Sequence, residues 1–196
     1  TLYANFTANT YSLTIKLGTG VSKVTYQVAG GTATAVTAET TITVAYSQTV
    51  KLTSAFSTGY EFSSFTSSGT IGASSSNAYT FTYNVTNALT ITANAKKEVY
   101  KVAVHSYTVP YNSTTGTIST TGGTVSGADD SVTYGDSHTV TASQATGYTF
   151  KGWFEASDCS GTAKSTSVSY TFTMKDVGTS GTTYNLYAKF TRNAYS

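Results

Sequence analysis

The chain of 196 residues contains one cysteine, one proline, one methionine and two histidines. The single cysteine, Cys159, has no second cysteine to pair with, so internal disulfides cannot stabilise the fold. A zinc site needs three or four closely spaced Cys, His or carboxylate ligands. The few such residues present, including Asp129 and Asp130, do not have that spacing. We therefore expect neither a metal nor any other cofactor.

Charged residues are also scarce. They make up 10% of the chain, with a net charge of +2, whereas an ordinary soluble domain carries about 25%. Nucleic-acid binding needs clustered lysines and arginines whose counterions are released, so we expect no nucleic-acid partner. No apolar run approaches the roughly 20 residues that cross a bilayer, and we expect no membrane insertion in this segment.

Aromatic residues are abundant, with 16 tyrosines and 9 phenylalanines. Aromatic and branched side chains fill a half-buried sheet surface better than they fit a helix, and the residues that long helices prefer are sparse. We therefore predict a mainly β protein. A threonine-rich, lysine-poor chain with almost no thiols is typical of an extracellular protein at the cell surface or cell wall of a bacterium that does not rely on disulfides.

One five-residue phrase occurs three times, each time at the end of a predicted strand. It reads Leu-Tyr-Ala-Asn-Phe at 2–6, Ile-Thr-Ala-Asn-Ala at 91–95 and Leu-Tyr-Ala-Lys-Phe at 186–190. The spacings of about 89 and then about 95 residues are the self-similarity of a tandem repeat. The chain is therefore predicted to be part of a repeat array.

The repeats divide the chain into four predicted segments. Residues 1–10 are the final strand of a preceding repeat, 11–99 a divergent repeat module, 100–193 a second module and 194–196 the start of a following segment. Each of the two modules is large enough to enclose a modest hydrophobic core. We expect them to form an elongated array in which neighbouring repeats of the same chain are partners.

Alternation of apolar and polar residues with period two indicates the strands. In the first module the opening strand carries its apolar face on Tyr11, Leu13, Ile15 and Leu17. Glycines at 18–20 predict a hairpin that leads to a second strand at 24–28. The threonine and alanine stretch at 32–40 is the one segment for which we expect a helical turn.

The second module repeats the first at an offset of about 88 residues. Gly-Tyr-Thr-Phe at 147–150 corresponds to Gly-Tyr-Glu-Phe at 59–62, and Trp153 stands where Phe65 stands in the first module. Aromatic positions are kept between the copies while hydroxyl positions differ. This is the expected result of a duplication in which burial constrains one face of each strand.

Three phrases of the second module form a known pattern: a Tyr-Gly turn at 134–135, a G-Y-x-F-x-G-W phrase at 147–153 and a closing L-Y-A-x-F strand at 186–190. Together they resemble the Listeria-Bacteroides repeat, the B-repeat type of the internalins, and residues 44–95 match it more faintly. The resemblance implies small β-grasp-like modules arrayed on bacterial surface proteins, as spacers or as contacts with other cells. Both units are longer than the family's usual module, so a β-sandwich is the alternative.

Catalytic groups are few. A serine nucleophile needs a base that a third group holds in place, and only His105 and His138 could serve as that base. Neither lies in a G-x-S-x-G phrase. We predict that His105 is a surface residue, that His138 is structural and that the protein is not an enzyme.

Three aromatic residues are the candidates for ligand contact. Trp153 is either a platform for a sugar ring or, as its equivalence to Phe65 favours, the central residue of the core. Tyr3 and Tyr187 have the opposite parity to the apolar residues of their strands and are expected to face solvent. Cys159 lies in a polar loop and is expected to be a reduced thiol without a role, the alternative being an exposed thiol that joins two chains.

Two functions remain open at this point. The first is a non-catalytic stalk or spacer segment of a bacterial adhesin-like surface protein. The second is a β module that binds a glycan or a host surface protein through exposed aromatic residues.

Overall fold

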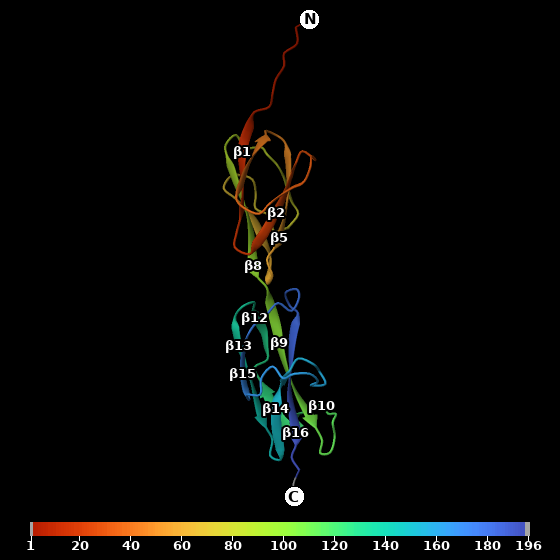
Figure 1. Cartoon of the computed structure of the whole chain (residues 1–196). Coiled ribbons are helices and arrows are strands. Elements are labelled where there is room, and N and C mark those ends of the chain that lie inside the picture. Colours follow the sequence, from red (N-terminus) through yellow and green to blue (C-terminus); the bar gives the residue numbers. More distant parts are fainter. Residues whose placement is uncertain (1, 195–196) are drawn as a thin grey trace. The chain divides into compact units, whose positions relative to one another are not determined.

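A computed structural model describes residues 2–194 (Figure 1). Within this range the regular structure consists of strands β1 to β16 and one 3-10 turn, η1 (Thr120–Gly122), so the predicted β class is confirmed. The chain forms two compact units, 1–97 and 98–196. The expected following segment at 194–196 lies outside the described residues except for Ala194.

The first unit contains two four-stranded sheets with the orders β4-β1-β8-β6 and β3-β2-β5-β7. Strand β1 pairs in parallel with β8, the last strand of the unit, and antiparallel with β4. Connecting two parallel neighbours requires a long crossover, and the remainder of the unit forms that crossover. The strands are β1 (Thr10–Leu17), β2 (Val21–Val28), β3 (Thr34–Val36), β4 (Thr40–Ala45), β5 (Thr49–Phe56), β6 (Tyr60–Ser67), β7 (Tyr79–Thr82) and β8 (Leu89–Lys97).

The predicted alternation explains how the two sheets pack. Leu13 and Ile15 of β1 are fully buried and lie opposite Leu89 and Ile91 of β8. Side chains from the other sheet meet them from across the core, so the unit is a two-layer sandwich. The core residues are Leu13, Ile15, Val24, Val44, Val50, Leu52, Phe65, Tyr79, Phe81, Tyr83, Leu89, Ile91 and Ala93.

Two local expectations for this unit are wrong. Residues 18–20 do not make a hairpin, because β1 and β2 belong to different sheets and the turn carries the chain from one sheet to the other. The hairpin instead follows Gly30 and joins β2 to β3, with Val24 opposite Val36. The stretch at 32–40 therefore contributes strand β3 instead of a helical turn. Alternation identifies a strand but not the strand with which it pairs.

The second unit follows the same plan. Its sheets have the orders β10-β9-β16-β14, with β12 also paired to β9, and β11-β13-β15. Again the first strand, β9, pairs in parallel with the last, β16. The strands are β9 (Val99–Val109), β10 (Thr117–Ile118), β11 (Gly123–Ser126), β12 (Asp129–Thr133), β13 (Ser137–Gln144), β14 (Tyr148–Phe154), β15 (Ser169–Thr173) and β16 (Thr183–Arg192).

The equivalence of Phe65 and Trp153 extends to the backbone. The pairing of β6 with β8 shifts register after Phe62, and that of β14 with β16 shifts after Phe150. The amides of Phe65 and Trp153 each donate to a serine carbonyl, over 2.8 Å in both cases. Both side chains are fully buried. A shared bulge confirms that the two units are copies, because bulges are kept within a family.

The second unit differs from the first in the length of its first strand. Strand β9 has 11 residues, whereas β1 has 8. The additional residues pair with the short strand β10 and support a second cluster on the other face of the sheet, formed by Tyr107, Val109, Phe154 and Cys159. The core proper contains Tyr100, Val102, Val132, Val140, Ala142, Trp153, Met174, Tyr184, Leu186, Ala188 and Phe190.

We predict that Phe65→Ala destabilises the first unit by about 3–5 kcal/mol, because it leaves a cavity in a fully buried site. Trp153 is the only tryptophan, so its fluorescence follows the unfolding of the second unit. In urea the circular dichroism transition of the first unit should shift and the fluorescence midpoint should not. The control, Thr80→Ala at an exposed position of β7 in the same unit, should change stability by no more than about 0.5 kcal/mol. If Phe65→Ala also shifts the fluorescence midpoint, the two cores do not unfold independently of each other.

Candidate ligand-binding surfaces

The two histidines occupy separate structural positions. The Nε2 atom of His105 lies 3.0 Å from Oδ1 of Asn185, and its ring stacks on Tyr187 with 4.7 Å between centroids. The Nε2 atom of His138 lies 2.7 Å from the carbonyl oxygen of Gly127. A nucleophilic triad needs a histidine between a serine and a carboxylate. The partners of these two rings are instead an amide oxygen and a backbone carbonyl oxygen. His105 is half-buried instead of lying on the surface as predicted.

Trp153 lies in the core. Its exposed fraction is 0%, and Phe150 meets it edge-on with 5.9 Å between ring centroids. A sugar ring needs an accessible aromatic face, and this ring presents none. The structure therefore corrects the interpretation of Trp153 as a stacking platform and agrees with its equivalence to Phe65.

The two candidate tyrosines differ in exposure. Tyr3 is 89% exposed, in a segment at 2–9 that forms no strand. Tyr187 is only half-buried, because it packs against the cluster on the outer face of its sheet as well as against His105. The loop that follows β14 supplies part of that cluster and covers a face that sequence parity alone assigned to solvent.

Cys159 belongs to the same outer cluster. It is 3% exposed, although it lies in a polar loop. Burial raises the pKa of its thiol to about 11. The reactive nucleophile is the thiolate, which such a pKa leaves scarce near neutral pH. The structure does not support the alternative of an exposed thiol that joins two chains, because the loop folds back onto β9 and brings Cys159 against Tyr107 and Val109.

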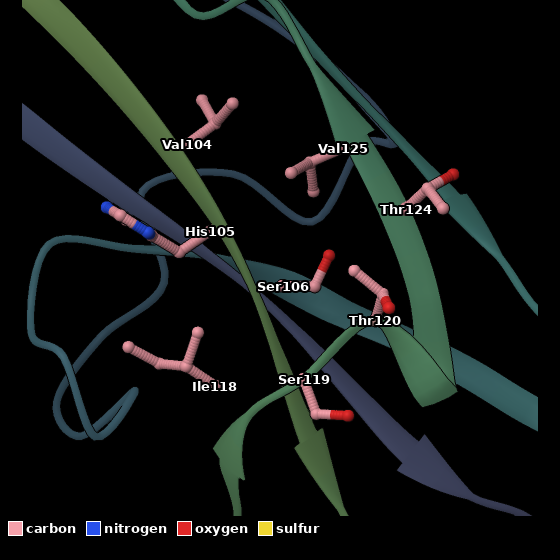
Figure 2. A pocket seen from close by; sticks show the side chains of 8 residues that line it. All are labelled: Val104, His105, Ser106, Ile118, Ser119, Thr120, Thr124 and Val125. Atoms are coloured by element: carbon pink, nitrogen blue, oxygen red, sulfur yellow. The ribbon is translucent and has the colours of Figure 1, made fainter.

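An open cleft, which sequence reasoning missed, lies beside β9 in the second unit (Figure 2). Its volume is about 590 Å³, within the range usual for ligand sites. Ser106 is 4% exposed there, and its Oγ has no hydrogen-bond partner within residues 2–194. An unpaired buried hydroxyl costs about 1–3 kcal/mol. The lining residues are Val104, His105, Ser106, Ile118, Ser119, Thr120, Thr124 and Val125.

One sequence signal for this cleft exists. Ser106 is the counterpart of Leu17, because Ser106 pairs with Ala188 in β16 as Leu17 pairs with Ala93 in β8. A hydroxyl therefore replaces an apolar side chain on the core-facing side of the first strand.

Residues 2–194 contain no group of three or more His, Cys, Asp or Glu side chains arranged to hold a metal ion. Over the same residues, no helix has the length and the apolar character needed to span a membrane.

Family comparison gives the origin of both modules. The model of the divergent InlB B-repeat domain matches residues 11–98 and again 107–194. The chain belongs to this family. The resemblance seen in the sequence is thereby confirmed, and it applies to the first module as well as to the second. The two units are tandem B-repeats.

Two solved structures are distantly similar to the pair of B-repeats. The Bacillus anthracis TIE protein shares 9% identity over 94% of this chain and 34% of its own, with a TM-score of 0.44. GBS52, the minor pilin of Streptococcus agalactiae, shares 8% identity over 95% of this chain and 98% of its own, with a TM-score of 0.27. The chain thus spans about a third of the length of the first protein. No curated protein matches it.

A charged cluster in the second B-repeat is centred on Glu155. Its carboxylate accepts hydrogen bonds from Lys164 at 2.8 Å, from Lys175 and from the Tyr184 hydroxyl at 2.6 Å. Burial alone would raise the pKa of Glu155, but these donors lower it to about 2. The carboxylate is thus held in its charged form, and it connects the end of β14 to β16 and to the loop between β14 and β15. This arrangement is structural, because a general acid or base near neutral pH needs a pKa close to 7.

We predict that Glu155→Gln lowers the free energy of unfolding at pH 7 by about 1–2 kcal/mol, since the side chain is 32% exposed and partly screened. The folded pKa of about 2 lies below the ordinary 4.5. The stabilisation is therefore complete above about pH 4.5 and is lost as the pH falls towards 2. Urea unfolding of both proteins should give midpoints that converge in this window.

The control for this prediction is Glu39→Gln, which removes an ion pair with Lys16 between largely exposed side chains. It should change stability little at any pH. A constant difference between the wild type and Glu155→Gln from pH 7 to pH 2 would show that charge is not the source of the stabilisation.

Proposed function

We propose that this pair of B-repeats is a non-catalytic spacer segment of an adhesin-like protein on the bacterial cell surface. The observation that carries the proposal is the pattern of similarity between the copies. Both keep the parallel pairing of first and last strands, the bulge and the buried aromatic ring at Phe65 or Trp153. Their surfaces differ. A module that serves only as a spacer needs to keep its fold, whereas its surface residues are free to vary.

The placement of polar groups supports a non-catalytic role. His105 and His138 are engaged with Asn185 and a backbone carbonyl, and Glu155 is neutralised by two lysines. Membership of the B-repeat family and the composition of the chain support an extracellular location.

We also propose that residues 1–10 are the closing strand of a preceding repeat. The phrase at 2–6 matches the one at 186–190, where Leu186, Ala188 and Phe190 are fully buried in β16. In this structure Leu2 and Phe6 are 102% and 88% exposed. Side chains of this kind are expected to be buried in a neighbouring module.

The alternative function is a binding module for a glycan or a host surface protein. The exposure of Tyr3 favours it, because exposed tyrosines provide contact area at low entropic cost. Tyr187 would contribute only its open side, and Trp153 would not contribute.

An adhesion assay separates the two functions. A known binding domain is displayed on bacteria through this segment, through an unrelated pair of β modules, or with no spacer. A spacer requires that both module pairs restore adhesion equally and that the segment alone mediates none. If the segment alone mediates adhesion that Tyr3→Ala and Tyr187→Ala weaken, the spacer proposal fails and the binding module is supported.

For the proposal on residues 1–10, we predict that removing residues 1–7 leaves the urea midpoints of both units unchanged within error. Residues 2–7 form no strand, and their side chains are exposed. Removal of residues 89–97, the closing strand of the first unit, is the matched control and should abolish folding of that unit, because β8 lies between β1 and β6. A clear loss of stability without residues 1–7 would assign the segment to the first unit.

A further inference from the structure

One edge of strand β9 is paired only in part. Along the other edge β9 pairs with β16 continuously, from Lys101 to Val109. On the edge in question, pairing with β12 ends at Val102, and pairing resumes where the Ser119 amide donates to the Ser106 carbonyl over 3.0 Å. Positions 103–105 therefore have no partner strand on this edge.

The backbone of Val104 faces this gap. Alternate residues of a strand direct their N–H and C=O groups to opposite edges. The carbonyls of Glu98 and Ser106 both accept hydrogen bonds on the β12 and β10 side, whereas the Lys101 amide donates on the β16 side. Val104 has the parity of Glu98 and Ser106, so its donor and its acceptor both point into the gap. The first B-repeat has no such gap, because β4 covers the equivalent position, Ile15.

Two clefts meet at Val104. The larger, of about 590 Å³, lies between β9 and β11, and the smaller, of about 280 Å³, lies towards Asp129 and Asp130. Figure 2 shows that the Ser106 hydroxyl points into the larger cleft, between Val125 and Thr120. Ser106 is 4% exposed, and its Oγ has no partner within the described residues.

We propose that the larger cleft, here called the β9–β11 cleft, binds the acetamido group of an N-acetylated sugar. The Val104 N–H and the Ser106 hydroxyl can both donate to the acetamido oxygen. A ring hydroxyl can donate to the Val104 carbonyl, because the N–H and C=O of one trans amide point in opposite directions and cannot meet both groups of Val104. The acetamido methyl group would lie against Val104 and Val125. No Asp, Glu, Lys or Arg lines the cleft, which favours a neutral ligand.

The dimensions of the gap favour a sugar over a peptide strand. Three unpaired residues extend over only about 10 Å, and β12 and β10 close the gap at its two ends. An extended peptide could not continue past them along β9. A compact ring can enter from solvent, with its hydroxyls beside Ser119 and Thr120 at the rim.

The test is an NMR titration of the whole ¹⁵N-labelled chain with N-acetylglucosamine, and with glucose as the control that lacks the acetamido group. We expect saturable shifts of the Val104, Ser106 and Val125 amides with the first sugar only. The amides of Ile15 and Leu17 in the first B-repeat should not move and provide an internal control.

Two substitutions at one position make the test specific. Ser106→Leu restores the residue type of Leu17 and fills the cleft, so it should abolish the shifts while keeping or raising the thermal midpoint. Ser106→Ala removes one hydrogen bond and should weaken binding by about 2- to 10-fold. The control is Ser126→Ala, at an exposed hydroxyl of β11 that does not line the cleft, and it should bind as the wild type does.

Several results would overturn the proposal: no saturable shift at Val104 and Ser106, equal shifts with glucose, or unchanged binding by Ser106→Leu. The proposal would also fail if N-methylacetamide saturated the same shifts at the same concentration as the sugar. The cleft would then recognise an amide without the sugar ring. The proposal goes beyond the spacer function and is tested separately: the titration reports on the β9–β11 cleft, whereas the adhesion assay reports on the segment as a spacer.

Discussion

The parallel pairing of the first and last strands holds each B-repeat together. Strand β8 lies between β1 and β6, and β16 lies between β9 and β14, so neither sheet is continuous until the end of its module is in place. Residues as far apart as Leu13 and Leu89 meet in this pairing. Closing such a distance costs chain entropy before any contact forms, and we therefore expect each module to fold slowly and as a whole.

The aromatic core depends on this arrangement. Phe65 and Trp153 stand on strands that pair with the closing strand, immediately after a bulge. The bulge turns the large ring inward, and the bridge to a serine on the following segment keeps it there. A module of fewer than 100 residues can bury only a modest core. One large side chain at its centre therefore has a disproportionate effect on stability.

On the exposed sheet faces, hydrogen bonds between hydroxyl groups link neighbouring strands, as ion pairs do in proteins with more charged residues. Thr14 and Thr41 bond across β1 and β4 at 2.9 Å, and Thr139 and Thr171 bond across β13 and β15 at 2.8 Å. Cross-strand pairs of this kind stabilise an open sheet face. The exception is Glu155, whose two lysines and one tyrosine form a compact charged cluster at the end of β14.

The two B-repeats diverge where the core imposes no constraint. The longer β9 supports a cluster on the outer face of its sheet, adds β10 at its edge and leaves positions 103–105 unpaired. The β9–β11 cleft is a consequence of this extension. It lies beside Ser106, whose counterpart in the first B-repeat, Leu17, packs against the core.

The β class, the duplication and the buried faces can be read from the amino-acid pattern, because period-two alternation and a repeated aromatic pattern are local signals. Leu13, Ile15 and Trp153 could all be assigned to cores in this way. The pairing of the strands could not be read in this way: in the folded chain β1 lies beside β8 and does not form a hairpin with β2. The burial of Cys159 and the cleft at Ser106 likewise result from a loop folding back and from an edge left open. Such contacts join residues distant in sequence, and no local pattern records them.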